Sequence, residues 1–111
     1  MINLFNDNCI NVLQSDDFKV LIDGKNVVVV TDPPFNIGYH YKTYNDRMKE
    51  TEYLDMLKQI FVYPFVVIHY PEEIYKIAQT VDKVPKRVVS WLYNSNTARQ
   101  HRDIAFFDIE P

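Results

Sequence analysis

Residues 27–35 of this chain read VVVVTDPPF, and this stretch decides the fold. A short continuous apolar run that ends in turn residues is typical of a buried strand in a parallel sheet, so we expect such a strand over Val27–Thr31. The two prolines end it sharply, because proline lacks a backbone N–H and fixes its own φ angle. The resulting corner holds the carboxylate of Asp32, free backbone carbonyls and the ring of Phe35. That set suits a flat ligand that carries an amino group, such as a nucleobase.

Around this stretch the sequence alternates between strand and helix patterns. We expect strands at Ile2–Phe5, Val27–Thr31, Phe65–His69, Arg87–Tyr93 and Ile104–Ile109, and helices from Asp7 or Asn8 to Leu13, over Asp16–Ile22, over Thr51–Phe61 and from Pro71 to Val81. Such alternation predicts an α/β fold with a mostly parallel sheet. The last two strands have no helix between them, so we expect the last strand to run antiparallel. Ligands of these sheets bind at the carboxyl ends of the parallel strands, where Asp32 and His69 would face one cleft.

The composition indicates one globular domain spanning residues 1–111. The apolar fraction of 47% is typical of a folded protein. The N-terminus lacks the basic start and long apolar stretch of a signal peptide, and no run reaches transmembrane length, so we expect a cytoplasmic protein with no membrane partner. Cys9 is the single cysteine and the three histidines lack ligand spacing, so we predict neither a disulfide nor a metal site.

The charge distribution leaves two interpretations open. A net charge of −3 argues against a nucleic-acid binder when the chain is taken as a whole. However, the segment from Lys83 to Arg102 contains basic residues and no acid. This segment either binds the phosphate groups of a nucleic acid or forms an ordinary solvated surface.

The tetrapeptide Asp32-Pro33-Pro34-Phe35 resembles the DPPY/F/W motif of amino-directed nucleic-acid methyltransferases, chiefly the adenine-N6 and cytosine-N4 enzymes. Three further parts of the chain resemble the same family: residues 4–13, residues 36–39, and residues 91–96 followed by 99–104. The last of these resembles a stretch in its phage-type adenine methylases. The resemblance implies a partial Rossmann-like methyltransferase sheet, mostly parallel with an antiparallel last strand. It also implies a DNA adenine-N6 methyltransferase-like domain of the restriction–modification kind, which uses S-adenosyl-L-methionine (AdoMet) to methylate an adenine turned out of the duplex.

The resemblance assigns roles to particular residues. Asp32 and the carbonyl of Pro33 would accept hydrogen bonds from the amine and drive it toward tetrahedral geometry, in a corner stiffened by Pro34, while Phe35 would stack on the base. The expected cofactor-binding residues are Asp7, Asn8 and Asp32. The expected substrate-binding residues are Asn36, Tyr39, Tyr41, Asn94, Arg99 and Arg102.

The chain departs from the family's pattern in two places. It has two glycines, Gly24 and Gly38, and no glycine-rich loop that binds AdoMet can be written from them. Asn8 stands where the family has an acid. We therefore expect the base-binding half of the enzyme, without the AdoMet loop or a target-recognition region, inactive alone. The apolar edge of Val27–Val30 would then be covered by another copy, by a partner chain or by the N-terminal strand.

Other interpretations stay open. The alternative to the methyltransferase-like domain is a non-catalytic fragment that binds nucleic acid or assembles with a second polypeptide. Cytosine-N4 methylation is less favoured, because serine more often stands at the position of Asp32 in those enzymes, and RNA or protein-amide substrates remain alternatives. Asp32-Pro33-Pro34 also occurs as an ordinary turn, and Asn94, Arg99 and Arg102 would have a structural role in a turn between strands. We expect His69 to be a strand-end histidine with a hydrogen-bond partner and not a proton shuttle.

Overall fold

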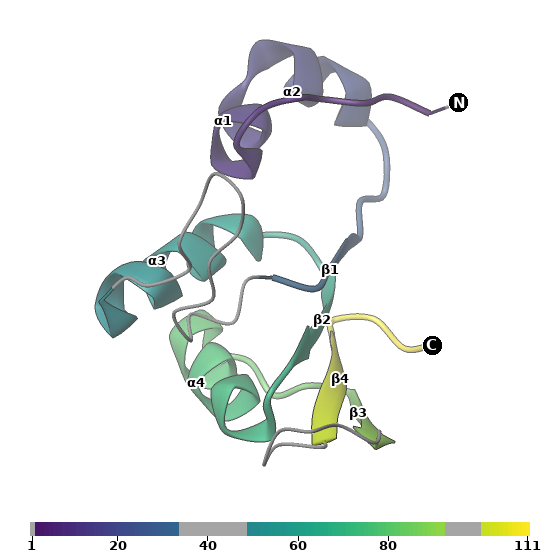
Figure 1. Cartoon of the computed structure of the whole chain (residues 1–111). Coiled ribbons are helices and arrows are strands. Elements are labelled where there is room, and N and C mark those ends of the chain that lie inside the picture. Colours follow the sequence, from purple (N-terminus) through teal and green to yellow (C-terminus); the bar gives the residue numbers. More distant parts are fainter. Residues whose placement is uncertain (1, 34–48, 93–100) are drawn as a thin grey trace.

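The computed structural model of the chain describes residues 2–33, 49–92 and 101–111 (Figure 1). Its elements are α1 (Cys9–Gln14), α2 (Asp16–Ile22), β1 (Val29–Thr31), α3 (Glu50–Ile60), β2 (Phe65–His69), α4 (Pro71–Val81), β3 (Arg87–Leu92) and β4 (His101–Phe107). The predicted α/β class is confirmed, since strands and helices alternate from β1 to β3. Among the described helices, none is long and apolar enough to cross a membrane.

The strands of the described residues form one open sheet in the order β1-β2-β4-β3. β1 and β2 pair in parallel, while β4 pairs antiparallel with β2 on one side and with β3 on the other. The antiparallel last strand is confirmed, but the sheet is mixed and not mostly parallel. The reason is the position of β4. It is inserted between two strands, so it makes two antiparallel pairings although β1, β2 and β3 all run in one direction.

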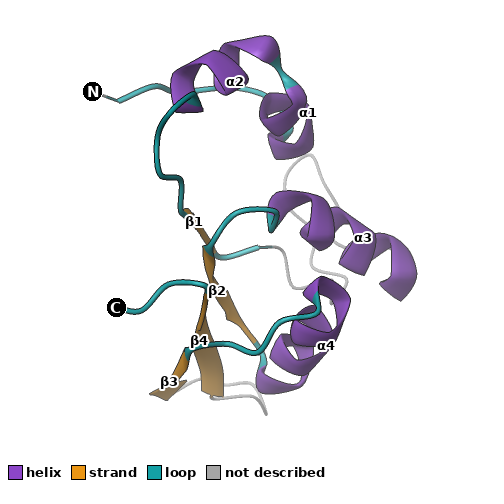
Figure 2. Ribbon diagram, turned by 180° about the vertical axis from the view of Figure 1, so that it is seen from behind, coloured by secondary structure: helices purple, strands orange, loops and turns teal. Residues whose placement is uncertain are grey.

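Among the described residues, helices cover one face of the sheet only. α3 and α4 pack on the same face, and no described helix lies on the other (Figure 1, Figure 2). Side chains alternate between the two faces of a strand, so the pairing register assigns a set of apolar residues to the uncovered face. These residues form what we call the bare sheet face: Val30, Val66, Ile68, Val89, Trp91, Ile104 and Phe106.

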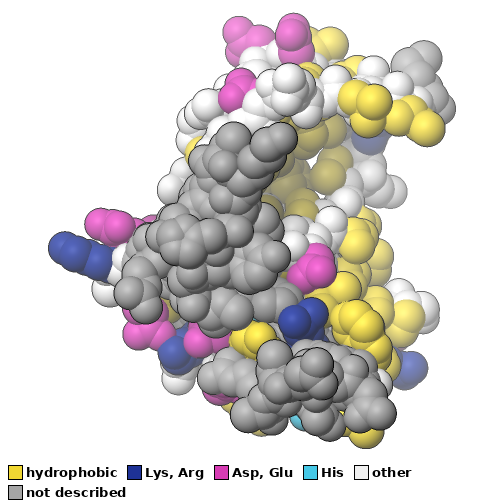
Figure 3. Space-filling view, in the orientation of Figure 1, with side chains coloured by type: hydrophobic (Ala, Val, Ile, Leu, Met, Phe, Trp, Pro, Cys, Tyr) yellow, Lys and Arg dark blue, Asp and Glu magenta, His cyan; other side chains and the backbone are white. Residues whose placement is uncertain are grey.

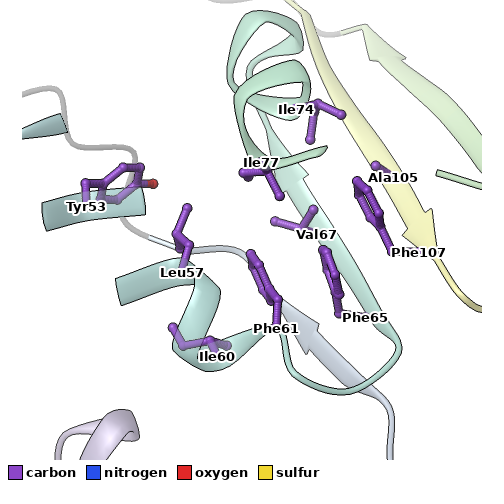
Figure 4. Close-up of a cluster of buried hydrophobic side chains, with 10 residues drawn as sticks. All are labelled: Tyr53, Leu57, Ile60, Phe61, Phe65, Val67, Ile74, Ile77, Ala105 and Phe107. Atoms are coloured by element: carbon purple, nitrogen blue, oxygen red, sulfur yellow. The ribbon is translucent and has the colours of Figure 1, made fainter. Parts of the chain in front are cut away.

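The hydrophobic core lies between the covered face and the two helices (Figure 4). Its centre is a stack of three aromatic rings. The ring of Phe65 in β2 lies 4.0 Å from that of Phe61 and 4.4 Å from that of Phe107, measured between centroids. Leu57 of α3 and Ile77 of α4 close the core from the helical side. Burial of these apolar side chains contributes most of the free energy that holds α3 and α4 on the sheet.

Local signals in the sequence set the helix starts. The side chain of Asn8 accepts a hydrogen bond from the N–H of Ile10, and that of Ser15 accepts one from the N–H of Phe18, so each residue caps a helix. Pro71 occupies the first turn of α4, where its missing N–H costs nothing. The predicted helices are thus confirmed, with boundaries that shift by a residue or two.

Two predicted strands near the N-terminus differ from the observed structure. Residues 2–5 form no strand, because they have no backbone partner among the described residues. β1 is limited to Val29–Thr31 and is an edge strand, so the prediction that it is buried is wrong: the side chain of Val30 is 73% exposed. Val30 is exposed because one neighbour of β1 is absent from the described part of the sheet and no described helix covers this face.

The last strand begins earlier than predicted. β4 starts at His101, three residues before the expected Ile104, so Arg102 lies in a strand and not in a turn. Pairing with both β2 and β3 extends the regular structure through these polar residues, which an apolar pattern alone does not mark.

Candidate functional site

Asp32 follows the last residue of β1, at the carboxyl end of that strand. Its side chain is exposed and makes no hydrogen bond or ion pair with another described residue, whereas Pro33 is buried directly behind it. The corner therefore fixes its backbone while leaving the carboxylate accessible. The other predicted motif residues, Pro34 and Phe35, lie outside the described residues.

The carboxyl end of β2 lies beside Asp32. Thr31 of β1 is the register partner of Val67, so β2 continues past the end of β1 to His69. Because the two strands are parallel, their carboxyl ends share one edge of the sheet, as the sequence predicts. This edge is the candidate functional site, and Asp32 is the exposed acid on it.

His69 is completely buried at this edge, and both of its ring nitrogens are used. The backbone N–H of Tyr70 donates to Nδ1 at 2.8 Å, and Nε2 lies 2.7 Å from the hydroxyl oxygen of Tyr53 in α3. Since Nδ1 accepts a hydrogen bond, the neutral ring carries its proton on Nε2. This N–H donates a hydrogen bond to the hydroxyl oxygen of Tyr53. His69 is therefore a strand-end histidine with hydrogen-bond partners, and this prediction is confirmed.

Arg102 reaches the same edge from β4. Its guanidinium carbon lies 5.5 Å from the centre of the Tyr70 ring, a cation–π contact with the residue that follows β2. The side chain is half-buried, so this contact holds the cation beside the end of β2. Of the predicted substrate-binding residues, Arg102 is the one that the described structure brings to the site. Asn36, Tyr39, Tyr41, Asn94 and Arg99 lie outside the described residues.

A second polar group lies at the start of β4, on the helix-covered side. Nε2 of His101 is 2.7 Å from Oδ1 of Asp103, and the hydroxyl of Ser90 donates to the same oxygen at 3.3 Å. Asp103 is also the register partner of His69. This cluster is not predictable from the sequence pattern, because it depends on β4 lying between β2 and β3.

The two predicted cofactor-binding residues near the N-terminus have local roles. Oδ1 of Asp7 accepts from the backbone N–H of Asn8 at 2.7 Å and from the amide of Asn11 at 3.3 Å. Asn8 is the cap of α1. Asp7 also borders a hollow of about 380 Å³ between the N-terminal segment and the edge of β1, which is lined by Leu4, Phe5, Asp7, Cys9, Val30 and Thr31. The assignment of Asp7 and Asn8 to a cofactor remains a prediction.

Histidine, cysteine and acidic side chains of the described ranges do not gather in groups of three that could hold a metal ion. No protein-family model, curated protein or solved structure matches this chain. Its function therefore rests on the geometry of the site.

Proposed function

We propose that this chain is the base-binding part of a DNA adenine-N6 methyltransferase-like domain. In this proposal Asp32 and the backbone carbonyl of Pro33 receive the exocyclic amine of an adenine that has left the duplex. The observation that carries the proposal is the state of Asp32: an exposed carboxylate at the carboxyl end of a parallel strand, without a hydrogen-bond partner among the described residues. A carboxylate engaged in the scaffold would have no capacity left for a ligand.

The sheet supports a partial Rossmann-like fold. β1, α3 and β2 form a parallel β-α-β unit, and the last strand runs antiparallel, as the family resemblance implies. In open α/β sheets, ligands bind beyond the carboxyl ends of the strands, which is where Asp32 and Arg102 lie. Their position favours a ligand with both an amino group and a negative charge, and a nucleotide has both.

The chemistry of the corner suits an aromatic amine. The lone pair of such a nitrogen is delocalised into the ring, and hydrogen-bond acceptors fixed in place help to localise it. Asp32 would act by accepting hydrogen bonds, because a carboxylate is far too weak a base to remove a proton from this amine. The guanidinium of Arg102 would contact the phosphate backbone of the nucleic acid.

The described residues do not complete a site for AdoMet. The hollow beside β1 offers the carboxylate of Asp7 and mostly apolar walls. Gly24, the one glycine in the described ranges, lies in a turn after α2 and does not line this hollow. AdoMet would supply the methyl group if a second polypeptide completed the site, and base binding is the step that we assign to this chain alone.

A second candidate function is that of a non-catalytic assembly module. The open edge of β1 and the bare sheet face favour it, because contiguous exposed apolar surface marks interaction sites. This candidate predicts association without any preference for adenine.

The test is the binding of single-stranded oligonucleotides by fluorescence anisotropy. One oligonucleotide carries adenine, and the other carries purine, which lacks the amino group, at the same positions. A hydrogen bond to a charged acceptor contributes about 1.5–3 kcal/mol, so we expect roughly tenfold or stronger preference for adenine. Asp32→Asn should abolish most of this preference.

The matched control is Asp55→Asn, which removes an exposed acid from α3 and should keep the preference. Equal affinity of the wild-type chain for the two oligonucleotides would contradict the proposal. So would a preference that survives Asp32→Asn.

A further inference from the structure

The first residues of the chain form an exposed apolar segment. Residues 2–5, which we call the N-terminal segment, belong to no helix or strand and make no backbone hydrogen bond to another described residue. The side chains of Ile2 and Leu4 are 86% and 92% exposed, and that of Phe5 is also exposed. Large apolar side chains so close together are costly to leave in water.

The edge of β1 has open backbone groups with which such a segment could pair. Val29 and Thr31 are hydrogen-bonded toward β2, and in a parallel ladder the residue between them directs its N–H and C=O to the opposite side. The backbone groups of Val30 therefore point to the open edge. Natural edge strands are usually protected by a lysine, a proline or a bulge, and none of these occurs within β1.

The N-terminal segment and the edge of β1 border the same hollow without pairing with each other. Asn3, Leu4 and Phe5 line it on one side, and Val29 to Thr31 line it on the other. Hydrophobic side chains line this hollow and continue along the molecule on the side away from α3 and α4 (Figure 3). The N-terminus projects to that same side in both ribbon views (Figure 1, Figure 2). A second molecule seated on the bare sheet face would lie within reach of the N-terminal segment.

We propose that two copies of this chain form a dimer by exchanging their N-terminal segments. Residues 2–5 of each copy pair with the edge of β1 in the other copy and become an additional strand of its sheet. The exchange satisfies the backbone of Val30 and buries Ile2 and Leu4 against the bare sheet face.

A second copy of this chain fits these observations better than a lipid or a small apolar molecule does. The open groups of Val30 require a peptide backbone, which a lipid or a small apolar molecule does not supply. The N-terminal segment is long enough to pair along the whole of β1, and its alternation places Ile2 and Leu4 on one side, as a strand beside an apolar face requires. Each copy carries both an N-terminal segment and an open β1 edge. A two-fold dimer therefore pairs both segments with both edges at once. The proposal is independent of the base-binding function.

The first test is the oligomeric state, measured by analytical ultracentrifugation across a dilution series. We expect the wild-type chain to be a dimer. Val30→Lys places a charge on the bare sheet face at the β1 edge and should give a folded monomer, as should deletion of residues 2–5. The matched control is Val84→Lys, which changes an exposed valine in the connection between α4 and β3 and should leave the dimer intact. Circular dichroism would show that each variant keeps its fold.

The second test identifies the contact itself. In a Cys9→Ser background, Leu4→Cys and Val30→Cys are combined and oxidised. Exchange predicts a disulfide-linked dimer on a non-reducing gel, and two chains that carry one substitution each should cross-link when mixed. A disulfide confined to single chains would overturn the proposal, because the segment would then pair with its own β1. A wild-type chain that stays monomeric at every concentration would also overturn it, as would a dimer that survives both Val30→Lys and the deletion.

Discussion

The hydroxyl oxygen of Tyr53 lies 2.7 Å from Nε2 of His69, and this contact joins α3 to the carboxyl end of β2. Both side chains are buried, so neither atom can exchange its partner for water. Because Tyr53 lies in the helix that follows the motif segment and His69 lies beside the end of β1, the pair fixes the helix against the candidate site. The contact therefore has a measurable structural consequence.

We predict that Tyr53→Phe lowers the free energy of unfolding by about 1–3 kcal/mol. The substitution removes the hydroxyl that lies 2.7 Å from Nε2 of His69, and the loss of one partner of a buried hydrogen bond costs about that much. Urea unfolding followed by circular dichroism measures the change. Tyr75→Phe is the control, since Tyr75 is 74% exposed on α4, and its effect should stay within about 0.5 kcal/mol. Equal stability of Tyr53→Phe and wild type would show that the contact contributes nothing.

Phe65 is the residue on which the core depends most. Its ring is fully buried and stacks between Phe61 and Phe107. We predict that Phe65→Ala costs about 3–5 kcal/mol, enough to unfold much of a small domain. Val62→Ala, at an exposed position after α3, should change stability little. Thermal unfolding of the two variants compares them directly, and similar melting temperatures would contradict the assignment of the core.

Substitution of Arg102 tests whether the site binds phosphate. If its guanidinium contacts one phosphate of a single strand, Arg102→Gln should weaken binding and reduce the slope of log K against log salt concentration by about 0.7. Anisotropy titrations at several salt concentrations measure this slope. Lys58→Gln, an exposed cation in α3, should leave the slope unchanged. An unchanged slope in Arg102→Gln would place the cation away from the nucleic acid.

Lys76 gives a prediction about pH. Its ammonium group contacts the carboxylates of Glu50 in α3 and Glu73 in α4, and these hydrogen bonds, that of Glu50 first, raise the pKa of Lys76 above its usual 10.5. Because the pKa is higher in the folded state, the stabilisation is fully present below pH 10.5 and is lost as the pH rises through the folded-state pKa.

We therefore expect Lys76→Met to lower the free energy of unfolding by less than about 1 kcal/mol at neutral pH, since exposed ion pairs are weak. The difference from wild type should disappear in strongly alkaline buffer. Urea unfolding in both buffers measures it, with Lys58→Met as the control. A difference that grew with alkaline pH would have the wrong sign for this linkage.

The sequence predicted the elements that local patterns determine. Asn8, Ser15 and Pro71 mark helix starts by their own chemistry, and the apolar run of residues 65–69 is a strand as expected. The position of β4 was not predictable in this way, because its insertion between β2 and β3 depends on contacts between distant residues. The contacts of His69 with Tyr53 and of Arg102 with Tyr70 were not predictable for the same reason. Each joins residues that are far apart in sequence or lie on different elements.

The exposure of β1 has a related explanation. A run of four valines indicates burial on both sides, but burial also requires neighbours, and a sequence pattern does not show whether they are present. Asp32 was predictable for the opposite reason. Its place at the end of a strand follows from the valines before it and the prolines after it.

The place of β4 in the sheet also constrains how the chain acquires its structure during translation. Among the described strands, β3 pairs with β4 alone, and β4 leaves the ribosome after β3. Until residues 101–107 emerge, nascent β3 therefore lacks the strand with which it pairs, while β1, α3 and β2 can already associate. Cotranslational folding of this chain should thus proceed in two stages, and a ribosome that stalls after β3 has left the exit tunnel, but before residue 101 has, would trap the first stage with β3 accessible to chaperones and proteases.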